Sequence, residues 1–258
     1  MKVSSSRAQS RDLSQVCAIV LAAGRGSRMK AKTKNKVAFK LGGHPMIAHT
    51  VDHLLKSGIN NIIAVVGFQS DSVRKSLGNK VFYATQTEQL GTGDALKSAL
   101  PLITPGVVTV LAVYGDDSAF YPPELFADMV KKKVNLGCDL LFLTIHKNDP
   151  TGLGRIVRSP SGQILRIVEE KNATSEEKKI QEINTGFYCF DRDFLVRYLN
   201  QIKKNPVSGE YYLTDMVEIA LSHGKKIEAL YIADDSIWHG VNNRSDLVKG
   251  RAKIKLSL

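Results

Sequence analysis

Residues 17–29, CAIVLAAGRGSRM, join an apolar run to a loop that contains two closely spaced glycines. The apolar run has the length and composition of a buried strand. Gly24 and Gly26 allow the backbone to approach a ligand, and their amides can face an anion. Arg28 and Lys36 add positive charge. The stretch therefore predicts a strand followed by an anion-binding loop, and an ordinary glycine turn on a basic surface is the alternative.

The rest of the chain continues this alternation. Apolar stretches rich in Val, Ile and Leu alternate with segments of helical period, which is the pattern of βαβ units around a mainly parallel sheet. The glycine loop lacks the third glycine of a dinucleotide fingerprint and the Gly-Lys-Ser/Thr of a Walker loop. We predict an α/β fold with a Rossmann-like, mainly parallel mixed sheet flanked by helices. Strands are predicted near 17–22, 61–66, 80–84, 107–114, 138–145, 183–190 and 226–232, and helices near 45–57, 70–77, 91–101, 122–135, 191–202 and 212–223.

One stretch breaks this rhythm. Residues 154–170, GRIVRSPSGQILRIVEE, have the pattern of two short alternating strands joined by a Pro-Ser-Gly turn. We predict a β-hairpin excursion over about 151–182 that folds over a substrate crevice. It belongs to a domain spanning 16–258, which follows a basic, disordered arm over 1–15. The sequence contains no hexapeptide repeat of the kind that builds a left-handed β-helix, so we expect no acetyltransferase domain.

Composition restricts the class of partner. The formal net charge is +11, which suits nucleic acid, an anionic surface or anionic small substrates. The lysines lack interleaved aromatic residues, so we do not expect nucleic-acid binding. No apolar run reaches the roughly 18 to 20 residues of a membrane helix, and no membrane association is expected. Cys17, Cys138 and Cys189 lie far apart in or beside apolar runs, which favours reduced core thiols and a cytoplasmic location.

The glycine loop resembles a known family signature. LAAGRGSRM, followed by Lys36, is similar to the LAAGxGTRM…PK motif of sugar-phosphate nucleotidylyltransferases. The resemblance implies that the loop wraps a nucleotide triphosphate and that Arg28 and Lys36 neutralise the phosphates. The sequence departs from the motif at Ser27, where threonine is usual, and at Asn35, which replaces a proline, and the loop is one residue longer. The loop residues implied to line the nucleotide are Leu21, Ala22, Gly24 and Gly26.

A second segment concerns the base. Residues 86–93, QTEQLGTG, join a predicted strand to a predicted helix. A uracil ring presents both a donor and an acceptor on its pairing edge, and a Gln side chain offers both complements. A Gly-Thr-Gly sequence can also simply mark the start of a helix without binding a ligand. The segment is similar to the QxEQLGTG motif of the uridylyltransferase branch, which implies that Gln86, Gly91 and Thr92 read the base.

Two carboxylates follow the strand predicted near 107–114. Asp116 and Asp117 lie at the edge where open α/β sheets bind ligands, and carboxylate oxygen suits Mg²⁺. A turn capped by Asp is the alternative. The segment resembles the family's YGD motif, which implies that Asp116 holds a catalytic Mg²⁺ together with Asn242 of GVNNR. Asp117 stands where the family more often has an apolar residue, and we expect it near the metal without contact.

Further motifs follow in the family's order. DPTGLGRI at 149–156, IVEEK at 167–171, EINTG at 182–186 and GEYYLTD at 209–215 resemble its DPTGYGRI, IVExK, EINTG and GEYYLTD. Singly, these positions have ordinary alternatives: Gly186 can form a strand bulge, and Asn243-Arg244 can cap the last helix. The residues that the resemblance implies for the amino-sugar pocket are Gly154, Glu169, Asn184, Tyr212 and Thr214.

Together the motifs imply an enzyme that transfers a uridylyl group from UTP to N-acetylglucosamine 1-phosphate with Mg²⁺. The alternatives are transfer to another hexose 1-phosphate such as glucose 1-phosphate, a non-catalytic nucleotide-sugar sensor and a basic RNA-binding protein. The sequence does not decide whether the protein forms a homo-oligomer. The histidines form no ligand cluster by spacing, because His49 and His53, one helical turn apart, lack an obvious third ligand. Only His239 is expected near the site.

Overall fold

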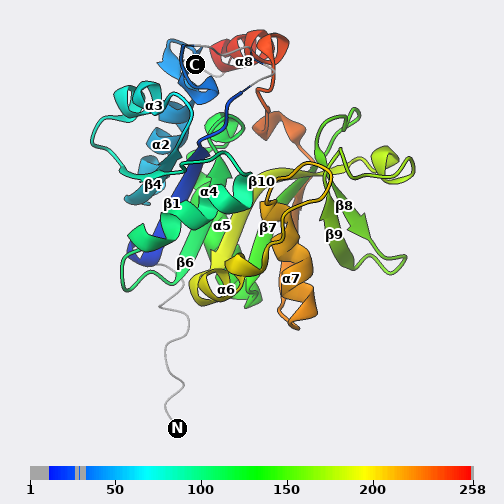
Figure 1. Ribbon diagram of the computed structural model, residues 1–258. Helices are drawn as coiled ribbons and strands as arrows, with labels where there is room; N and C mark the ends of the chain where they lie inside the picture. The colour runs from blue at the N-terminus through cyan, green and yellow to red at the C-terminus, as the bar shows by residue number, and fades with distance from the viewer. Residues whose placement is uncertain (1–11, 27–28, 30–32, 257–258) are drawn as a thin grey trace.

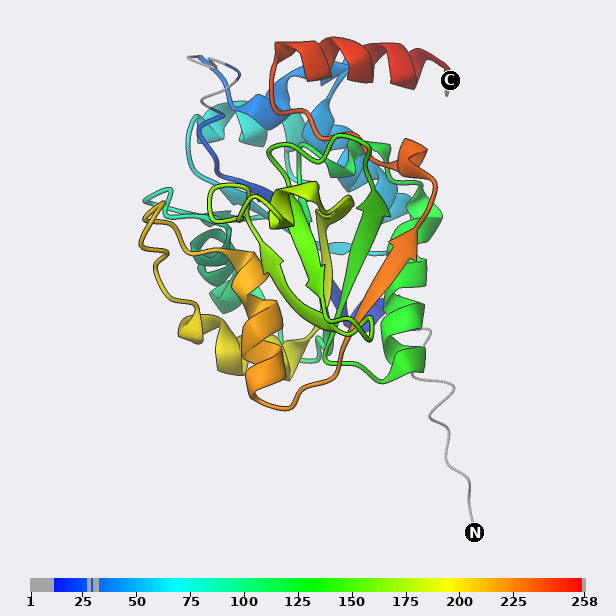
Figure 2. The same ribbon diagram turned by 90° about the vertical axis from the view of Figure 1, so that its right-hand side faces the viewer.

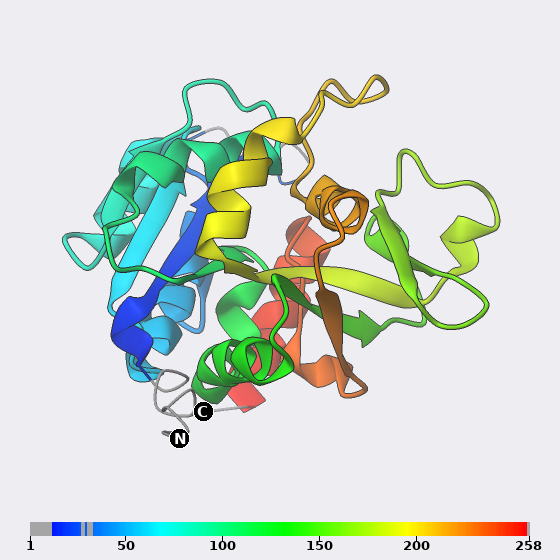
Figure 3. The same cartoon turned by 90° about the horizontal axis from the view of Figure 1, so that it is seen from below.

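A nine-stranded sheet lies between two layers of helices (Figure 1 and Figure 3). The computed structural model describes residues 12–26, 29 and 33–256. The main path of the sheet has the strand order β11-β7-β10-β6-β1-β4-β5. These strands are β1 (Val16–Ala22), β4 (Asn61–Val66), β5 (Phe82–Thr85), β6 (Thr109–Tyr114), β7 (Leu140–His146), β10 (Glu182–Asp191) and β11 (Ile227–Ile232).

Strand direction determines where a site can form. β1 pairs in parallel with β4 and β6, and β4 pairs in parallel with β5. β10 runs antiparallel to both β6 and β7, whereas β11 is parallel to β7. The predicted mainly parallel mixed sheet is therefore confirmed. Because β10 is reversed, its first residues lie beside the carboxyl end of β6, at the edge where the glycine loop leaves β1.

Alternate residues of β1 face the two helical layers. Ala18 and Val20 join a core with α2, α3 and α5, and Ile19 and Leu21 join a second core with α4, α6 and α7. Burial on both faces explains the continuous apolar run in the sequence. Burial also raises the pKa of the Cys17 thiol to about 12, as expected for a core cysteine. The helices are α2 (Met46–Lys56), α3 (Ser70–Leu77), α4 (Thr92–Ala99), α5 (Pro123–Leu136), α6 (Arg192–Tyr198) and α7 (Met216–Ser222).

The predicted hairpin is present as β8 (Gly154–Arg158) and β9 (Ile164–Val168), paired antiparallel (Figure 2). β8 also pairs with the first residues of β10, where Arg155 lies opposite Ile183. Arg155 is only 1% exposed, and its guanidinium forms an ion pair with Glu170 at 2.5 Å. β9 packs against α7. The hairpin therefore extends the main sheet and is fixed at its base.

The helix α8 (Arg244–Leu256) had no range among the helices predicted from the sequence, although Asn243-Arg244 was considered as the cap of a last helix. Its residues, RSDLVKGRAKIKL, are rich in cations, include a glycine and show no strong apolar stripe, so local pattern did not indicate it. Leu247 and Ile254 nevertheless pack against Leu41 and Met46 beside the start of α2. Tertiary packing therefore supports this helix more than propensity does. In Figure 2 it lies across the top of the molecule.

Several boundaries differ from the predicted ones. The helix predicted over 191–202 ends at Tyr198 and continues as a 3-10 turn, and the helix predicted over 212–223 starts as another 3-10 turn before Met216.

Most of the predicted arm lies outside the described residues, but its last three residues form a 3-10 turn capped by Asp12. Among the described helices none combines the length and the apolar character needed to cross a membrane. The short elements are β2 (Lys40–Leu41), β3 (His44–Pro45) and the turns η1 (Leu13–Gln15), η3 (Lys36–Ala38), η4 (Leu100–Leu102), η5 (Ser118–Phe120), η6 (Glu177–Lys179), η7 (Leu199–Gln201), η8 (Leu213–Asp215) and η9 (Asp235–Ile237).

Candidate active site

A cavity of about 470 Å³ opens at the carboxyl ends of β1 and β6, and we call it the nucleotide compartment. Three segments form it: the glycine loop after β1, the segment between β5 and α4, and the residues after β6. Arg28, a predicted phosphate ligand, lies outside the described residues. The other residues predicted for the nucleotide and its phosphates all line the cavity: Leu21, Ala22, Gly24, Gly26, Lys36, Gln86, Gly91, Thr92 and Asp116.

A second cavity, of about 410 Å³, adjoins the first, and we call it the sugar compartment. It lies between the hairpin, the segment before η8 and the segment before α8, and it is lined by Glu169, Tyr212 and Asn242. The residues that line both compartments are Gly26, Lys36, Thr92 and Glu210. A ligand in one compartment would therefore meet a ligand in the other beside Lys36.

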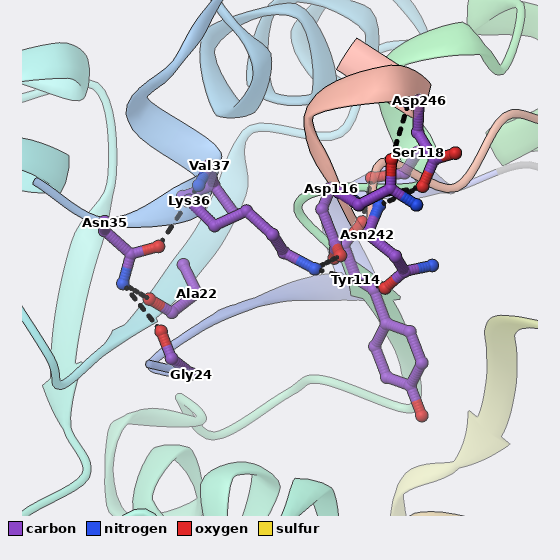
Figure 4. Close-up of polar contacts among 11 residues, drawn as sticks. Ala22, Gly24, Asn35, Lys36, Val37, Tyr114, Asp116, Ser118, Asn242 and Asp246 are labelled. Atoms are coloured by element: carbon purple, nitrogen blue, oxygen red, sulfur yellow. Dashed lines mark hydrogen bonds and ion pairs between the residues drawn. The ribbon is translucent and has the colours of Figure 1, made fainter. Parts of the chain in front are cut away.

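Lys36 contacts two oxygen-bearing side chains at this boundary (Figure 4). Its ammonium forms an ion pair with Asp116, which follows β6, and lies 3.5 Å from the Oδ1 atom of Asn242. The side chains of Lys36 and Asp116 are 17% and 14% exposed, so water screens the pair only partly. The structure thus brings together three of the four residues predicted for phosphate and metal chemistry, from segments 80 and 206 residues apart along the chain, and the fourth, Arg28, is outside the described residues.

Asn35 holds Lys36 in position. The side chain of Asn35 is buried, and its amide donates hydrogen bonds to the carbonyls of Ala22 at 2.9 Å, Gly24 at 3.2 Å and Phe68 at 2.7 Å. Its Oδ1 atom accepts a hydrogen bond from the Val37 N–H and caps η3. The proline usual in the family fixes this turn through its ring, whereas Asn35 fixes it through side-chain hydrogen bonds.

The start of α8 holds Asn242. Asn243 and Asp246 form reciprocal hydrogen bonds in a capping box: the Asp246 carboxylate accepts from the Asn243 N–H at 3.0 Å, and the Asn243 Oδ1 accepts from the Asp246 N–H at 3.0 Å. The same carboxylate accepts from the Asn242 N–H at 2.9 Å. The capping role considered for Asn243 is therefore confirmed, and it is also what aims Asn242 into the site.

Asp117 points away from both compartments. Its Oδ1 atom is buried without a hydrogen-bond partner among the described residues, and it lies 3.2 Å from the position that a Cβ atom at Gly240 would take. Burial and the neighbouring charge of Asp116 raise the pKa of Asp117 well above its usual range. The two adjacent carboxylates therefore have different environments, and only Asp116 faces the cavities.

The predicted sugar residues divide into two groups. Glu169 and Tyr212 line the sugar compartment, whereas Gly154, Asn184 and Thr214 do not; Thr214 lines a further cavity together with Glu169 and Tyr212. The Thr214 hydroxyl donates to the Glu169 carboxylate at 3.2 Å, and burial raises the pKa of that carboxyl. Asn184 is occupied by neighbours, since its amide donates to the Tyr188 hydroxyl at 2.6 Å and its Oδ1 accepts from the Gly186 N–H at 3.2 Å.

Tyr114, Glu210 and Asn35 line the nucleotide compartment but were not predicted as site residues. Tyr114 occupies space left by Gly186, where β10 is irregular and φ is +79°. A Cβ atom at Gly186 would lie 2.4 Å from the Tyr114 ring. The bulge considered for Gly186 is thus present, and it leaves room for the Tyr114 ring. Gly186 was the one signal of this arrangement in the sequence, and a glycine does not indicate which side chain fills the space beside it.

The histidines contribute no metal site among the described residues, where no group of three His, Cys, Asp or Glu side chains is placed to hold an ion. The His49 ring bonds to the Leu41 carbonyl at 2.9 Å, and His53 is packed beside it. His239 bonds to the Asp246 carbonyl at 2.7 Å. His239 lines neither compartment, so it lies near the site only through the segment that it supports.

The chain belongs to the nucleotidyl transferase family, whose sequence model matches residues 17–256. It is 40% identical over 238 residues to the bifunctional protein GlmU of Exiguobacterium sibiricum and 41% identical over 246 residues to that of Symbiobacterium thermophilum. These alignments cover 92% and 94% of this chain. They cover 53% and 52% of the relatives, so the chain spans about half the length of the curated relatives it matches.

The fold also matches a solved structure. A crystal structure from Bacillus anthracis, described as a candidate glucose-1-phosphate thymidylyltransferase in complex with a sucrose, superposes with a TM-score of 0.76. The match covers 92% of this chain and 94% of that one at 23% identity. At this identity the likeness establishes the fold, and the sheet with helices on both faces is common to the two proteins.

Proposed function

We propose that the protein transfers a uridylyl group from UTP to N-acetylglucosamine 1-phosphate and releases pyrophosphate. The observation that carries this proposal is the meeting of two compartments at Lys36, where the oxygens of Asp116 and Asn242 converge on one cation. One compartment has the residues expected for a nucleotide, and the other is lined by Glu169 and Tyr212 of the sugar motifs. The family membership and the relatives named GlmU support the same reaction.

The proposed reaction needs charge neutralisation more than proton transfer. A sugar phosphate oxygen is already ionised at neutral pH, so no general base is required. The difficulty is that one polyanion attacks another, and preorganised cations and positioning lower such a barrier. Lys36 lines both compartments, so its ammonium can neutralise charge on either side of the bond that changes. Backbone amides of the glycine loop would hold the phosphates of the nucleotide.

The oxygen donors at the boundary suit a magnesium ion. In this structure the Lys36 ammonium stands where the Asp116 carboxylate and the Asn242 amide oxygen approach each other, which is a position for a hard cation. Asp116 and Asn242 would hold Mg²⁺, which would supply charge stabilisation for the two phosphate groups. Phosphate oxygens and water would complete the ligand set, as is usual for this ion.

A pyrophosphate-release assay with Mg²⁺ over a grid of nucleoside triphosphates and sugar 1-phosphates tests the proposal. We expect the highest turnover with UTP and N-acetylglucosamine 1-phosphate. Faster turnover with dTTP and glucose 1-phosphate would assign the protein to the other sugar-nucleotide reaction. Binding of a nucleotide sugar without turnover in any pair would make the protein a sensor.

A further inference from the structure

The side-chain amide of Gln86 is held in one orientation. Gln86 is only 3% exposed, and its Nε2 atom donates two hydrogen bonds, to the Gly91 carbonyl at 3.1 Å and to the Asp94 carboxylate at 2.7 Å. Both partners are acceptors only. A flipped amide would lose both bonds and set its oxygen against two acceptors, one of them a carboxylate, so the orientation follows from the chemistry of the neighbours.

The orientation decides what Gln86 offers a ligand. With both amide hydrogens used, only the Oε1 atom remains, and it takes part in no hydrogen bond with the described residues. Gln86 lines the nucleotide compartment, so this oxygen is the group that a base can meet. Gln86 therefore acts as an acceptor, although a free Gln side chain can donate as well.

Asp94 lies on the other side of Gln86. It is in the first turn of α4 and lines a separate cavity with Lys97 and Lys203, while it lines neither of the two compartments as the described residues form them. Its carboxylate therefore lines no surface that the nucleotide would meet, and its hydrogen bond to the amide of Gln86 links it to the nucleotide compartment.

We infer that Asp94 is a positioning residue for base specificity, because it fixes Gln86 as an acceptor that selects pyrimidines with a ring N–H. This inference rests on the proposed nucleotidyl transfer. Uracil and thymine present an N3–H donor that pairs with Oε1. Cytosine has an unprotonated N3 at the same position, so its lone pair would face that of Oε1. A buried polar group left unpaired in this way discriminates strongly between otherwise similar ligands.

Substitution of Asp94 tests this role against a matched control. In Asp94→Ala the amide can turn and present its NH₂ group to cytosine more easily, because only the Gly91 carbonyl still opposes the turned oxygen. Asp71 is the control, because it is an exposed carboxylate in the first turn of α3, so Asp71→Ala removes a comparable charge at a helix start. Each variant is assayed for kcat/KM with UTP and with CTP at saturating sugar phosphate and Mg²⁺.

We expect the wild type to prefer UTP over CTP by about 100-fold or more in kcat/KM. Asp94→Ala should lower that preference at least about 10-fold, through KM, with kcat for UTP changed less than about twofold. Asp71→Ala should leave the preference unchanged. An equal loss with both nucleotides in Asp94→Ala, or an unchanged ratio, would overturn the inference, because a merely structural carboxylate would not alter base choice.

Two further measurements keep the outcome clear. If Asp94→Ala does not fold, Asp94→Asn replaces it, and the loss of charge should still lower the UTP preference about threefold. An unchanged ratio in that folded variant would also overturn the inference. Calorimetric titration of UTP and CTP without sugar phosphate measures the same preference as binding, so it tests Asp94 even if no uridylyl transfer occurs and the proposed function fails.

Discussion

The nucleotide compartment and the sugar compartment are built in different ways. The first stands on the ends of two adjacent parallel strands, β1 and β6, and every described residue predicted for it lines the cavity. The second is assembled from the hairpin and two loops that are distant in sequence, and only Glu169 and Tyr212 of the five predicted sugar residues line it. A site on a sheet edge is thus determined by local motifs, whereas a site between excursions depends on how those excursions pack.

The largest effect is expected at the boundary of the two compartments. Lys36→Ala removes the only side-chain ammonium that lines both cavities among the described residues, so turnover should fall on the order of 10²- to 10³-fold. Sugar-phosphate binding, measured by calorimetry, should weaken much less, because in the proposed reaction the charge acts most as pyrophosphate departs. Lys34→Ala is the control, since Lys34 stacks on Phe39 and lines neither cavity. A harmless Lys36→Ala would mean that a neighbouring lysine fills this role.

Asn35→Ala tests whether the nucleotide compartment owes its rigidity to one side chain. Three buried or partly buried carbonyls lose their donor, so the free energy of unfolding should fall by about 2 kcal/mol. Turnover should fall about 10-fold, because Lys36 is no longer held in place. Urea unfolding and the pyrophosphate assay measure the two effects. Asn60→Ala, which removes an exposed local hydrogen bond, should change neither. An unchanged free energy of unfolding in Asn35→Ala would show that the glycine loop keeps its conformation without the Asn35 hydrogen bonds.

Glu169→Gln tests whether the two compartments act independently. Of the two compartments, Glu169 lines only the sugar compartment, so KM for the sugar phosphate should rise about 10-fold while the dissociation constant for UTP stays unchanged. Steady-state kinetics and a UTP titration separate the two quantities. Glu176→Gln is the matched control on the exposed part of the same excursion, where Glu176 contacts only Lys179 in a side-chain ion pair. A weakened UTP affinity in Glu169→Gln would mean that the compartments are coupled.

The last of these predictions concerns stability and its pH dependence, at Asp215 in the turn η8. Burial, with a contribution from Glu218, raises the pKa of Asp215 from 3.8 to about 6. Because the folded-state pKa is the higher one, the charged carboxylate costs stability above pH 6, and this cost disappears as the pH falls toward 4. Asp215→Asn should therefore raise the free energy of unfolding by about 2 kcal/mol at pH 7.5 and by less than half of that at pH 4.5.

Urea unfolding at the two pH values checks the Asp215 prediction. Glu218→Gln should give a smaller gain in the same direction, because Glu218 is the lesser cause of the shift. An increase in the free energy of unfolding of Asp215→Asn that is the same at both pH values would mean that burial does not destabilise the charged carboxylate.

What the sequence could predict follows the same division. β1 and the β8–β9 hairpin were predictable because their apolar patterns are local, and the glycine loop of the nucleotide compartment follows β1 directly. The role of Asn35 could not be predicted, because its three carbonyl partners lie at the end of β1, in the glycine loop and in the segment after β4. The sequence indicated a cap at Asn243-Arg244 but not the extent of α8, which is stabilised by contacts with a distant helix.

The sugar residues illustrate the same limit. A motif identified Asn184, but the Tyr188 hydroxyl that occupies its amide is visible only after β10 has folded with its irregularity at Gly186. Side-chain orientation at the second compartment is therefore a tertiary property, and the predicted contacts of Asn184, Gly154 and Thr214 with the sugar stay predictions.

The most direct test of the proposed site compares two adjacent carboxylates. Asp116→Asn keeps the shape and an oxygen donor but removes the charge that faces Lys36, so turnover at saturating substrates and Mg²⁺ should fall on the order of 100-fold, about 3 kcal/mol, with folding retained. Asp117→Asn should stay active, because Asp117 lines neither compartment. The contradictory result would be an active Asp116→Asn together with an Asp117→Asn that has lost its dependence on magnesium.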